Sequence, residues 1–405
     1  MSGVEKEWEP TADVALDGIR VLDLSRLVAG NAVSHLLADH GAEVIKVEKP
    51  GKGDDLRAWN TEGVPIHWKA LCRNKLSVTL NVRDPEGIEM LKKLAATSRV
   101  LIENFKPGTL EKMGVGPEVL HQINPDLIIV RISGWGQDGM WKHRPGFGSL
   151  VEGLSGFAAM NGYEDRPPVL PPLALADMIA GLYGAFSVMV AIREIELKSG
   201  PGQVIDLPLF DPVHSILGPI VANYDLTGNV PKRTGSLSNQ TAPRNVYKCK
   251  DGKYVALSAS MQAMAERVLK TIGRGELLED PRYATNDARV ANRDTLDPIV
   301  GAFMAERTQQ ECLDLFEEAG VTVGAVADVA QIAEHPYIYD REVVVSMPDE
   351  QAGRVAMHNV IPRLSNTPGK LRRPAPELGE HNSEVWGGLG YSSEDLAELT
   401  ARGVI

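Results

Sequence analysis

One aspartate, Asp177, stands alone among small and apolar residues and is the first candidate for chemistry. It is the only ionisable side chain between Arg166 and Arg193, apart from the weakly acidic Tyr183. A carboxylate in such surroundings is either a helix N-cap or a group kept for catalysis. The double proline before it favours capping, but the residue three positions on is alanine, so a full capping box is absent. Both roles stay open on these residues.

Basic side chains recur just after the predicted strands, although the protein as a whole is acidic. Cations that gather near one edge of a sheet indicate an anionic ligand, and Phe105 among them could stack on a purine. Each lysine taken singly is equally well explained as a solvated surface charge. The cations in question are Lys46, Lys49, Arg57, Arg73, Lys75, Lys106 and Lys112.

The elements that must position these groups alternate between strand and helix. Ile19–Leu24 and Glu43–Glu48 are short β-rich runs, and Asn31–His40 between them has helical spacing with Gly41 as its stop. A helix is also predicted over Pro85–Ala95. Alternation of this kind predicts a mostly parallel sheet that is covered on both faces. Further strands are expected over 99–104, 127–132 and 204–209.

The first strand–loop–helix–strand unit has the outline of a dinucleotide-binding opening, with Glu48 at the end of its second strand. Its loop, residues 25–30, holds one glycine, whereas GxGxxG needs three so that the backbone can approach a pyrophosphate. Nicotinamide binding is therefore disfavoured, although open α/β sheets bind other ligands beyond their strand ends. Neither GxxxxGK[ST] nor GxSxG occurs, which disfavours a P-loop nucleotidase and an α/β-hydrolase.

The composition and the predicted elements of the chain change in its second half. Ala174–Glu194 predicts a long apolar helix, whereas 230–245 is rich in Gly, Ser, Asn and Pro, which is typical of a loop. A hairpin with Asp251-Gly252 at its tip follows, then helical pieces as far as residue 319. Residues 342–378 are typical of a long return linker with some strand, and a last helix is expected over Ser393–Ala401.

Composition excludes several classes of protein. The 405 residues carry 42 Lys+Arg against 54 Asp+Glu, a net charge of −12 that disfavours nucleic-acid binding. No uninterrupted apolar run approaches the roughly 18 residues of a membrane span. Cys72, Cys249 and Cys312 are far apart, and without CxxC or HExxH neither a disulfide framework nor a metal is expected. The acidic start lacks a signal peptide, so the cytoplasm is the expected compartment.

Several segments follow one another in a familiar order over essentially the whole chain. They resemble the class III CoA-transferases, the family of formyl-CoA transferase and carnitine CoA-transferases. The matching segments are LDGIRVLDLSRLVAG at 16–30, GAEVIKVEKPGKGDDLR at 41–57, NKLSVTLNVRDPEG at 74–87, LIENFKPGTLEKMG at 101–114, NPDLIIVRISGWGQDG at 124–139, ALADMIAG at 174–181, GPGQVIDLPLFD at 200–211 and APELGEHNSEVW at 375–386.

The resemblance implies an α/β fold built as an interlocked-ring homodimer. A large Rossmann-like domain with a mostly parallel sheet would take residues 1–225, with the catalytic aspartate and the CoA site. A smaller α/β domain with an entry loop would take 226–335. Residues 336–405 would form the return linker and the C-terminal part of the large domain.

The resemblance also implies the chemistry. Asp177 would attack an acyl-CoA thioester, form an aspartyl anhydride and then carry CoA as an aspartyl thioester before passing it to a carboxylic acid. Coenzyme A and acyl-CoA would be substrates, with no metal and no partner other than a second copy of the chain. The implied CoA contacts, with the lysines and the arginine at the phosphates, are Val28, Ala29, Lys49, Asn104, Phe105, Lys112 and Arg144.

Two alternatives remain. α-Methylacyl-CoA racemases of the same superfamily use a histidine with an aspartate, but the matching stretch here, 144–148, holds none, and His143 lies just upstream. The other alternative is a non-catalytic CoA-binding protein. Formate specificity is doubtful because 235–240 replaces a run of glycines. Arg57, Arg73 and Arg244 are spare cations for a second carboxylate, which favours succinyl-CoA as donor.

Overall fold

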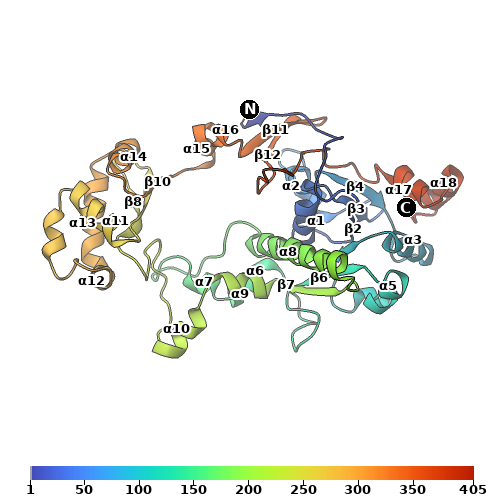
Figure 1. The fold of residues 1–405 in the computed structure, drawn as a ribbon, viewed down its shortest axis with the longest axis horizontal. Helices are drawn as coiled ribbons and strands as arrows, with labels where there is room; N and C mark the ends of the chain where they lie inside the picture. Colours follow the sequence, from blue (N-terminus) through green and yellow to red (C-terminus); the bar gives the residue numbers. More distant parts are fainter. Residues whose placement is uncertain (1) are drawn as a thin grey trace. The chain divides into compact units, whose positions relative to one another are not determined.

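The computed structural model describes residues 2–405 and divides the chain into two compact units. The first unit takes the chain up to Ala158, together with Leu170–Thr227 and Pro336–Ile405. The second unit takes Ala159–Val169 and Gly228–His335. The chain therefore enters the second unit twice, first for the short segment Ala159–Val169 and then for Gly228–His335, before it returns to the first unit. The colours in Figure 1 follow this order along the chain.

A six-stranded parallel sheet forms the centre of the first unit, as the alternation of elements predicts. The chain order reverses between β2 and β5, where Val21 is in register with Val100. This is the order of doubly wound nucleotide-binding sheets, in which ligands bind beyond the strand ends at the reversal. In spatial order the strands are β4 (Lys75–Thr79), β3 (Glu43–Glu48), β2 (Arg20–Asp23), β5 (Val100–Glu103), β6 (Ile128–Ser133) and β7 (Val204–Pro208).

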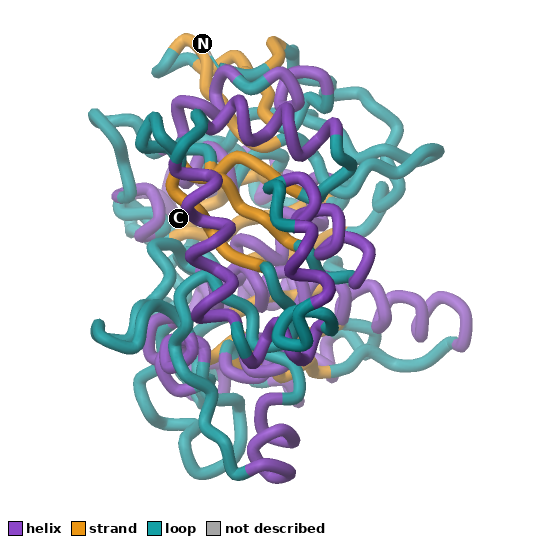
Figure 2. The backbone as a smooth tube through the Cα atoms, turned by 90° about the vertical axis from the view of Figure 1, so that its left-hand side faces the viewer, coloured by secondary structure: helices purple, strands orange, loops and turns teal. Residues whose placement is uncertain are grey.

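Helices cover both faces of this sheet. Alternate residues of a strand point to opposite faces, so Val21 joins the apolar cluster with α1 and α8, and Leu22 joins the cluster with α3 and α5. Strands buried on both sides are continuous apolar runs, which is why they are readable in the sequence. Figure 2 shows helices on either side of the strands. The four helices are α1 (Ala29–Asp39), α3 (Pro85–Ala96), α5 (Pro117–Ile123) and α8 (Leu175–Lys198).

Two glycines bring α8 close to α1. A Cβ atom on Gly181 would lie 2.6 Å from the Cβ of Ala32, and one on Gly184 would lie 2.6 Å from Cγ2 of Val33. Any larger side chain would push the helices apart, because these distances are far below van der Waals contact. The first turn of α8, with Asp177, is thereby held beside the start of α1.

Helix α8 begins earlier than a capping role for Asp177 requires. Its N-cap is Ala174, so Asp177 is the third residue of the helix and does not cap it. The helix is long and apolar enough to cross a membrane by length and composition, yet one side of it is core, with Ala180 and Val188 fully buried. Its other side exposes large apolar residues, among them Leu182, Phe186, Val190 and Leu197.

Smaller sheets complete the two units. Near the N-terminus, β1 (Val4–Glu5) pairs in parallel with β11 (Val344–Asp349) of the return segment. β12 (Gly353–His358) closes that sheet and confirms the strand expected there. In the second unit the predicted hairpin is confirmed as β8 (Arg244–Lys248) and β9 (Tyr254–Ser258), joined by β10 (Val323–Val326).

The remaining helices pack against these sheets or against other helices, as α6 and α9 do against α8. In the second unit they enclose an apolar core around Phe316 and Leu269. The predicted last helix is confirmed as α18. The remaining bounds are α2 (Ile66–Leu71), α4 (Thr109–Lys112), α6 (Gly148–Leu154), α7 (Phe157–Met160), α9 (Phe210–Ile216), α10 (Ile220–Thr227), α11 (Gln262–Thr271), α12 (Asn286–Ala291), α13 (Arg293–Ala305), α14 (Gln309–Glu318), α15 (Val329–Glu334), α16 (Pro336–Asp340), α17 (Asn382–Gly388) and α18 (Ser393–Ala401), with 3₁₀ turns at Asp55–Ala58 and Gly275–Glu279.

Candidate active site

Two adjoining hollows open beyond the carboxyl ends of the central strands, all within the first unit. The first hollow, about 550 Å³, extends over the ends of β2, β3 and β4, and the second, about 450 Å³, over the ends of β5 and β6. They share Arg26, Asp55, Phe105 and Lys106, so one ligand can lie across both. Together they occupy the reversal of strand order, where doubly wound sheets bind ligands.

A buried ionic network holds the loop between β2 and α1 under these hollows. Lys46 donates to the carbonyl of Ser25 and lies 3.1 Å from Asp54, whose carboxylate accepts from the N–H of Leu27 at 2.9 Å. Burial alone would raise the pKa of Asp23, but Lys46 and Lys75 outweigh it and hold that pKa at about 2. The network is structural, because its charges compensate one another and rigidify the loop.

Asn104 clamps this loop to the end of β5. Its side-chain oxygen accepts from the N–H of Arg26 at 2.9 Å, and its amide donates to the carbonyl of Arg26 at 2.8 Å. The side chain lines the second hollow, but both of its polar atoms are already engaged. Its observed contacts position the Arg26 backbone, which spans the junction of the two hollows.

Asp177 lines the second hollow and not the first. Burial, and then the charge of Glu152, raise the pKa of Asp177 to about 6, although hydrogen bonds from its own backbone N–H and from that of Ala29 act in the other direction. Glu152 is buried and accepts from the N–H of Ala176 at 3.1 Å. Gly148 leaves room for the nucleophile, since a Cβ there would lie 2.9 Å from Asp177 Oδ2.

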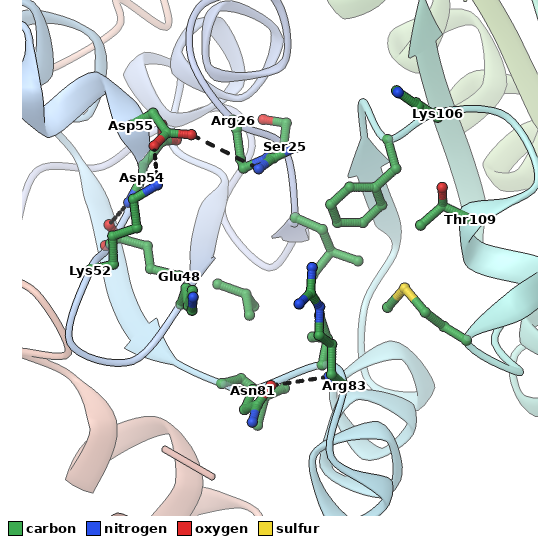
Figure 3. Close-up of a pocket in the computed structure, with 18 residues that line it drawn as sticks. Ser25, Arg26, Glu48, Lys52, Asp54, Asp55, Asn81, Arg83, Lys106 and Thr109 are labelled. Atoms are coloured by element: carbon green, nitrogen blue, oxygen red, sulfur yellow. Dashed lines mark hydrogen bonds and ion pairs between the residues drawn. The ribbon is translucent and has the colours of Figure 1, made fainter. Parts of the chain in front are cut away.

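The first hollow collects cations. Lys49 and Lys52 come from the segment after β3, Arg83 from the segment after β4 and Lys106 from the segment after β5. Figure 3 shows Arg83 reaching into this hollow opposite Ser25. Lys52 is also paired with Asp55 at 2.6 Å. Cations that converge from three strand ends suit a ligand with several phosphates.

The structure brings most of the predicted site residues together. Ala29, Asn104, Arg144 and Asp177 line the second hollow, Lys49 the first, and Phe105 both. The other two predicted contacts, Val28 and Lys112, line neither hollow: Val28 is buried against Leu56 and Trp68, and Lys112 is exposed at the end of α4.

Sequence reasoning missed Arg83 and Glu152. Arg83 could have been found from its position shortly after a strand, which is the feature that identified the other cations. Glu152 carried no such signal, because only the packing of α6 against α8 brings its carboxylate to Asp177.

Two of the spare arginines expected at a second carboxylate are committed elsewhere. Arg57 pairs with Glu48 at 2.7 Å and stacks 3.7 Å over Trp68, while Arg73 is fully buried against Asp39 at 2.6 Å. Burying a charge is costly unless it is paired, so these arginines stabilise the fold. Arg244 lies in the second unit and donates to the carbonyl of Ser236.

One cluster in the first unit has the residue types of a metal site. His35, Asp39 and His358 offer ligand atoms within 4.8 Å of one another. Both oxygens of Asp39 already accept from Arg73, at 3.1 and 2.6 Å. A guanidinium in that position competes with a cation for the carboxylate, so the cluster fits a buried ion pair better than a metal centre.

A doubly wound α/β sheet with a cation-lined hollow next to a half-buried carboxylate is the arrangement expected of an enzyme that acts on a phosphorylated, nucleotide-like substrate. The sequence profile described as CoA-transferase family III matches residues 16–382, so the chain belongs to that family and is a CoA-transferase. It is 38% identical to succinyl-CoA–D-citramalate CoA-transferase of Chloroflexus aurantiacus over 96% of this chain and 98% of the relative. Succinyl-CoA:glutarate CoA-transferase of Homo sapiens is 33% identical over 96% of this chain and 90% of the relative.

Solved structures agree with this assignment. A CAIB/BAIF family protein from Brucella suis matches with a TM-score of 0.82 and 33% identity, over 93% of this chain and all of that chain. The α/β fold with a parallel sheet and the family expected from the sequence motifs are therefore confirmed.

Proposed function

We propose that the protein moves CoA from succinyl-CoA to a carboxylic acid through covalent intermediates on Asp177. The observation that carries the proposal is the place of Asp177, which lines the second hollow, with the cation-lined first hollow beside it. The names of the two relatives described above, which join succinyl-CoA to citramalate and to glutarate, support the choice of donor and of substrate class.

The phosphates and adenine of CoA belong in the first hollow. Lys49, Arg83 and Lys106 would bind the phosphates, and Lys112, on the neighbouring helix α4, would reach them from outside. Phe105 lines both hollows and would contact the cofactor where it passes from one to the other. Val28 and Ala29 would border the pantetheine by their backbone, and Asn104 would hold the loop there. The thioester then reaches Asp177.

The reaction needs an ionised carboxylate and no net proton transfer. Asp177 attacks the thioester carbonyl, the C–S bond breaks, and CoA leaves as a thiolate with an aspartyl–succinyl anhydride behind it. The thiolate attacks the aspartyl carbonyl, which releases succinate and leaves an aspartyl–CoA thioester. The acceptor carboxylate attacks this thioester, a second anhydride forms, and the thiolate takes the new acyl group and frees Asp177.

The surroundings of Asp177 suit these steps. A carboxylate with a raised pKa is more basic and more nucleophilic than an exposed one, yet it is largely ionised at neutral pH. The N–H of Ala29, directed at the carboxylate, is placed to stabilise the oxyanion on the aspartyl carbonyl. No histidine lines the second hollow in the part of the chain that is described, so a histidine-based racemase has no base there.

Intact-mass spectrometry tests the proposal directly. Protein mixed with succinyl-CoA should gain the mass of CoA less water, and peptide mapping should place the adduct on Asp177. The Asp177→Ala variant should bind CoA but form no adduct and transfer nothing. Transfer by that variant, or an adduct elsewhere, would refute the mechanism.

The exposed apolar side of α8 supports a second proposal, that the chain is a homodimer. Phe186 is 68% exposed and Leu182 59%, and large apolar side chains gathered on one helix face are usually covered by a partner. Light scattering of the purified protein should give twice the chain mass. Phe186→Glu should shift it toward the monomer, whereas Lys198→Glu, at the end of the same helix, should not.

A further inference from the structure

The loop between β6 and α6, residues 134–147, is a compact arm that lines the second hollow. Trp135 and Trp141 pack edge to face with ring centroids 5.1 Å apart, and Trp135 donates to the carbonyl of Pro145 at 3.0 Å. The two ends of the loop touch, because a Cβ on Gly134 would lie 2.6 Å from the Cα of Gly146. The loop thus has its own small aromatic core and a fixed base.

This arm carries two cations that no acid neutralises. The guanidinium of Arg144 lies 4.1 Å over the ring of Trp141, and Lys142 is its near neighbour in the chain. No carboxylate within residues 2–405 lies in ion-pair distance of either side chain. Stacking on a tryptophan orients a guanidinium while it leaves the N–H donors free for a ligand.

The distribution of charge separates these two cations from the phosphate site. Arg26, Asp55 and Lys106 line both hollows, and Arg26 lies 3.9 Å from Asp55. Lys142 and Arg144, in contrast, line only the second hollow, together with Asp177. They therefore stand at the end of the site where the acyl group, not the nucleotide, would lie.

We propose that Lys142 and Arg144 bind the free carboxylate of a dicarboxylic acyl group and so select dicarboxylic over monocarboxylic substrates. The inference rests on the proposed transfer through Asp177 and adds the feature that the acyl chain must carry. A succinyl group keeps one carboxylate after its other end becomes a thioester. That charge would enter a hollow with Asp177 and, behind it, Glu152, so it needs cations of its own.

The test compares two donors that differ only in that carboxylate. Succinyl-CoA and butyryl-CoA have acyl chains of equal length, with a methyl group in butyryl-CoA where succinyl-CoA has the second carboxylate. The wild type should have the higher kcat/KM with succinyl-CoA. In Arg144→Gln the ratio of the two kcat/KM values should fall roughly 10- to 100-fold, the usual worth of a charge-assisted bidentate contact. Lys142→Gln should lower the ratio by less, and Arg144→Lys should restore part of it.

Matched variants separate this role from CoA binding. Arg83→Gln should lower kcat/KM for both donors alike, because its cation lines only the hollow assigned to the phosphates. If Arg144→Gln also lowers both alike, Arg144 is a CoA contact and the inference is wrong. The inference is also overturned if the double variant Lys142→Gln/Arg144→Gln keeps the wild-type ratio of kcat/KM for the two donors, or if the wild type prefers butyryl-CoA. Failure of the proposed function looks different: the wild type would form no Asp177 adduct with either donor.

Discussion

Replacing Asp177 by asparagine should abolish transfer and stabilise the protein. The native pKa of this carboxyl is about 6, against 3.8 for the free group, because burial and Glu152 disfavour the charge. A raised native pKa means that the ionised form is tolerated less well in the folded than in the unfolded chain. The difference of about 2 pH units corresponds to a folding penalty of about 3 kcal/mol at most, since the group is partly exposed and water screens it.

The folded and unfolded pKa values of Asp177 set the sign of its effect on folding stability and the pH range over which that effect develops. Well below pH 3.8 the Asp177 carboxyl is neutral in both the folded and the unfolded chain, so the folding penalty is absent and the carboxyl's contribution to stability is at its most favourable. That contribution is lost as the pH rises toward 6, so the wild type bears the whole penalty above about pH 7 and about half of it near pH 5. Asparagine keeps the shape and can still accept from the N–H of Ala29, but it bears no charge at any pH.

Thermal unfolding followed by fluorescence measures the effect as a difference between variants. Asp177→Asn should unfold up to roughly 6 °C above the wild type at pH 8, and this gap should narrow as the pH falls toward 5. Asp165→Asn, on an exposed turn of the second unit, removes one carboxylate without the penalty and serves as the control. A gap that does not depend on pH, or a variant less stable than the wild type at pH 8, would show that the charge of Asp177 is not disfavoured by its surroundings.

Three further outcomes follow from the same geometry. Formation of the CoA adduct in single-turnover experiments should fall about tenfold per unit of pH below 6, because only ionised Asp177 attacks; a flat profile to pH 5 would contradict the raised pKa. Gly148→Ala should slow adduct formation at least about tenfold, since its Cβ would lie 2.9 Å from Asp177 Oδ2, and an unchanged rate would mean that the carboxylate moves aside freely. Gly181→Ala should destabilise the first unit by about 1–3 kcal/mol in urea unfolding because it overpacks against Ala32, whereas Gly153→Ala, with open space around it in α6, should stabilise it slightly; equal effects would refute the packing argument.

The site was partly readable in the sequence for reasons that particular residues make clear. Asp177 was conspicuous because it is the one acid in a long apolar stretch, and Lys49, Asn104 and Phe105 because they directly follow strands. Arg57 and Arg73 were expected to be available for a second carboxylate, but a sequence does not show that both have buried partners. Asp177 was a candidate N-cap because the prolines before it suggested a helix start three residues later than the observed one.

The sequence by itself determined the alternation of elements, the parallel sheet, the hairpin and the isolated acid. Each of these depends on the local pattern of apolar residues and turn formers, and the sheet strands are buried on both faces, so their runs are unmistakable. Only the tertiary structure decided the order of the strands and the hollows at its reversal. It alone placed Glu152 and the N–H of Ala29 at Asp177, and the free cations Lys142 and Arg144 on the same hollow. Such pairings join segments that are distant in the chain, and their free energy comes from burial and charge contacts that exist only once the helices have packed on the sheet.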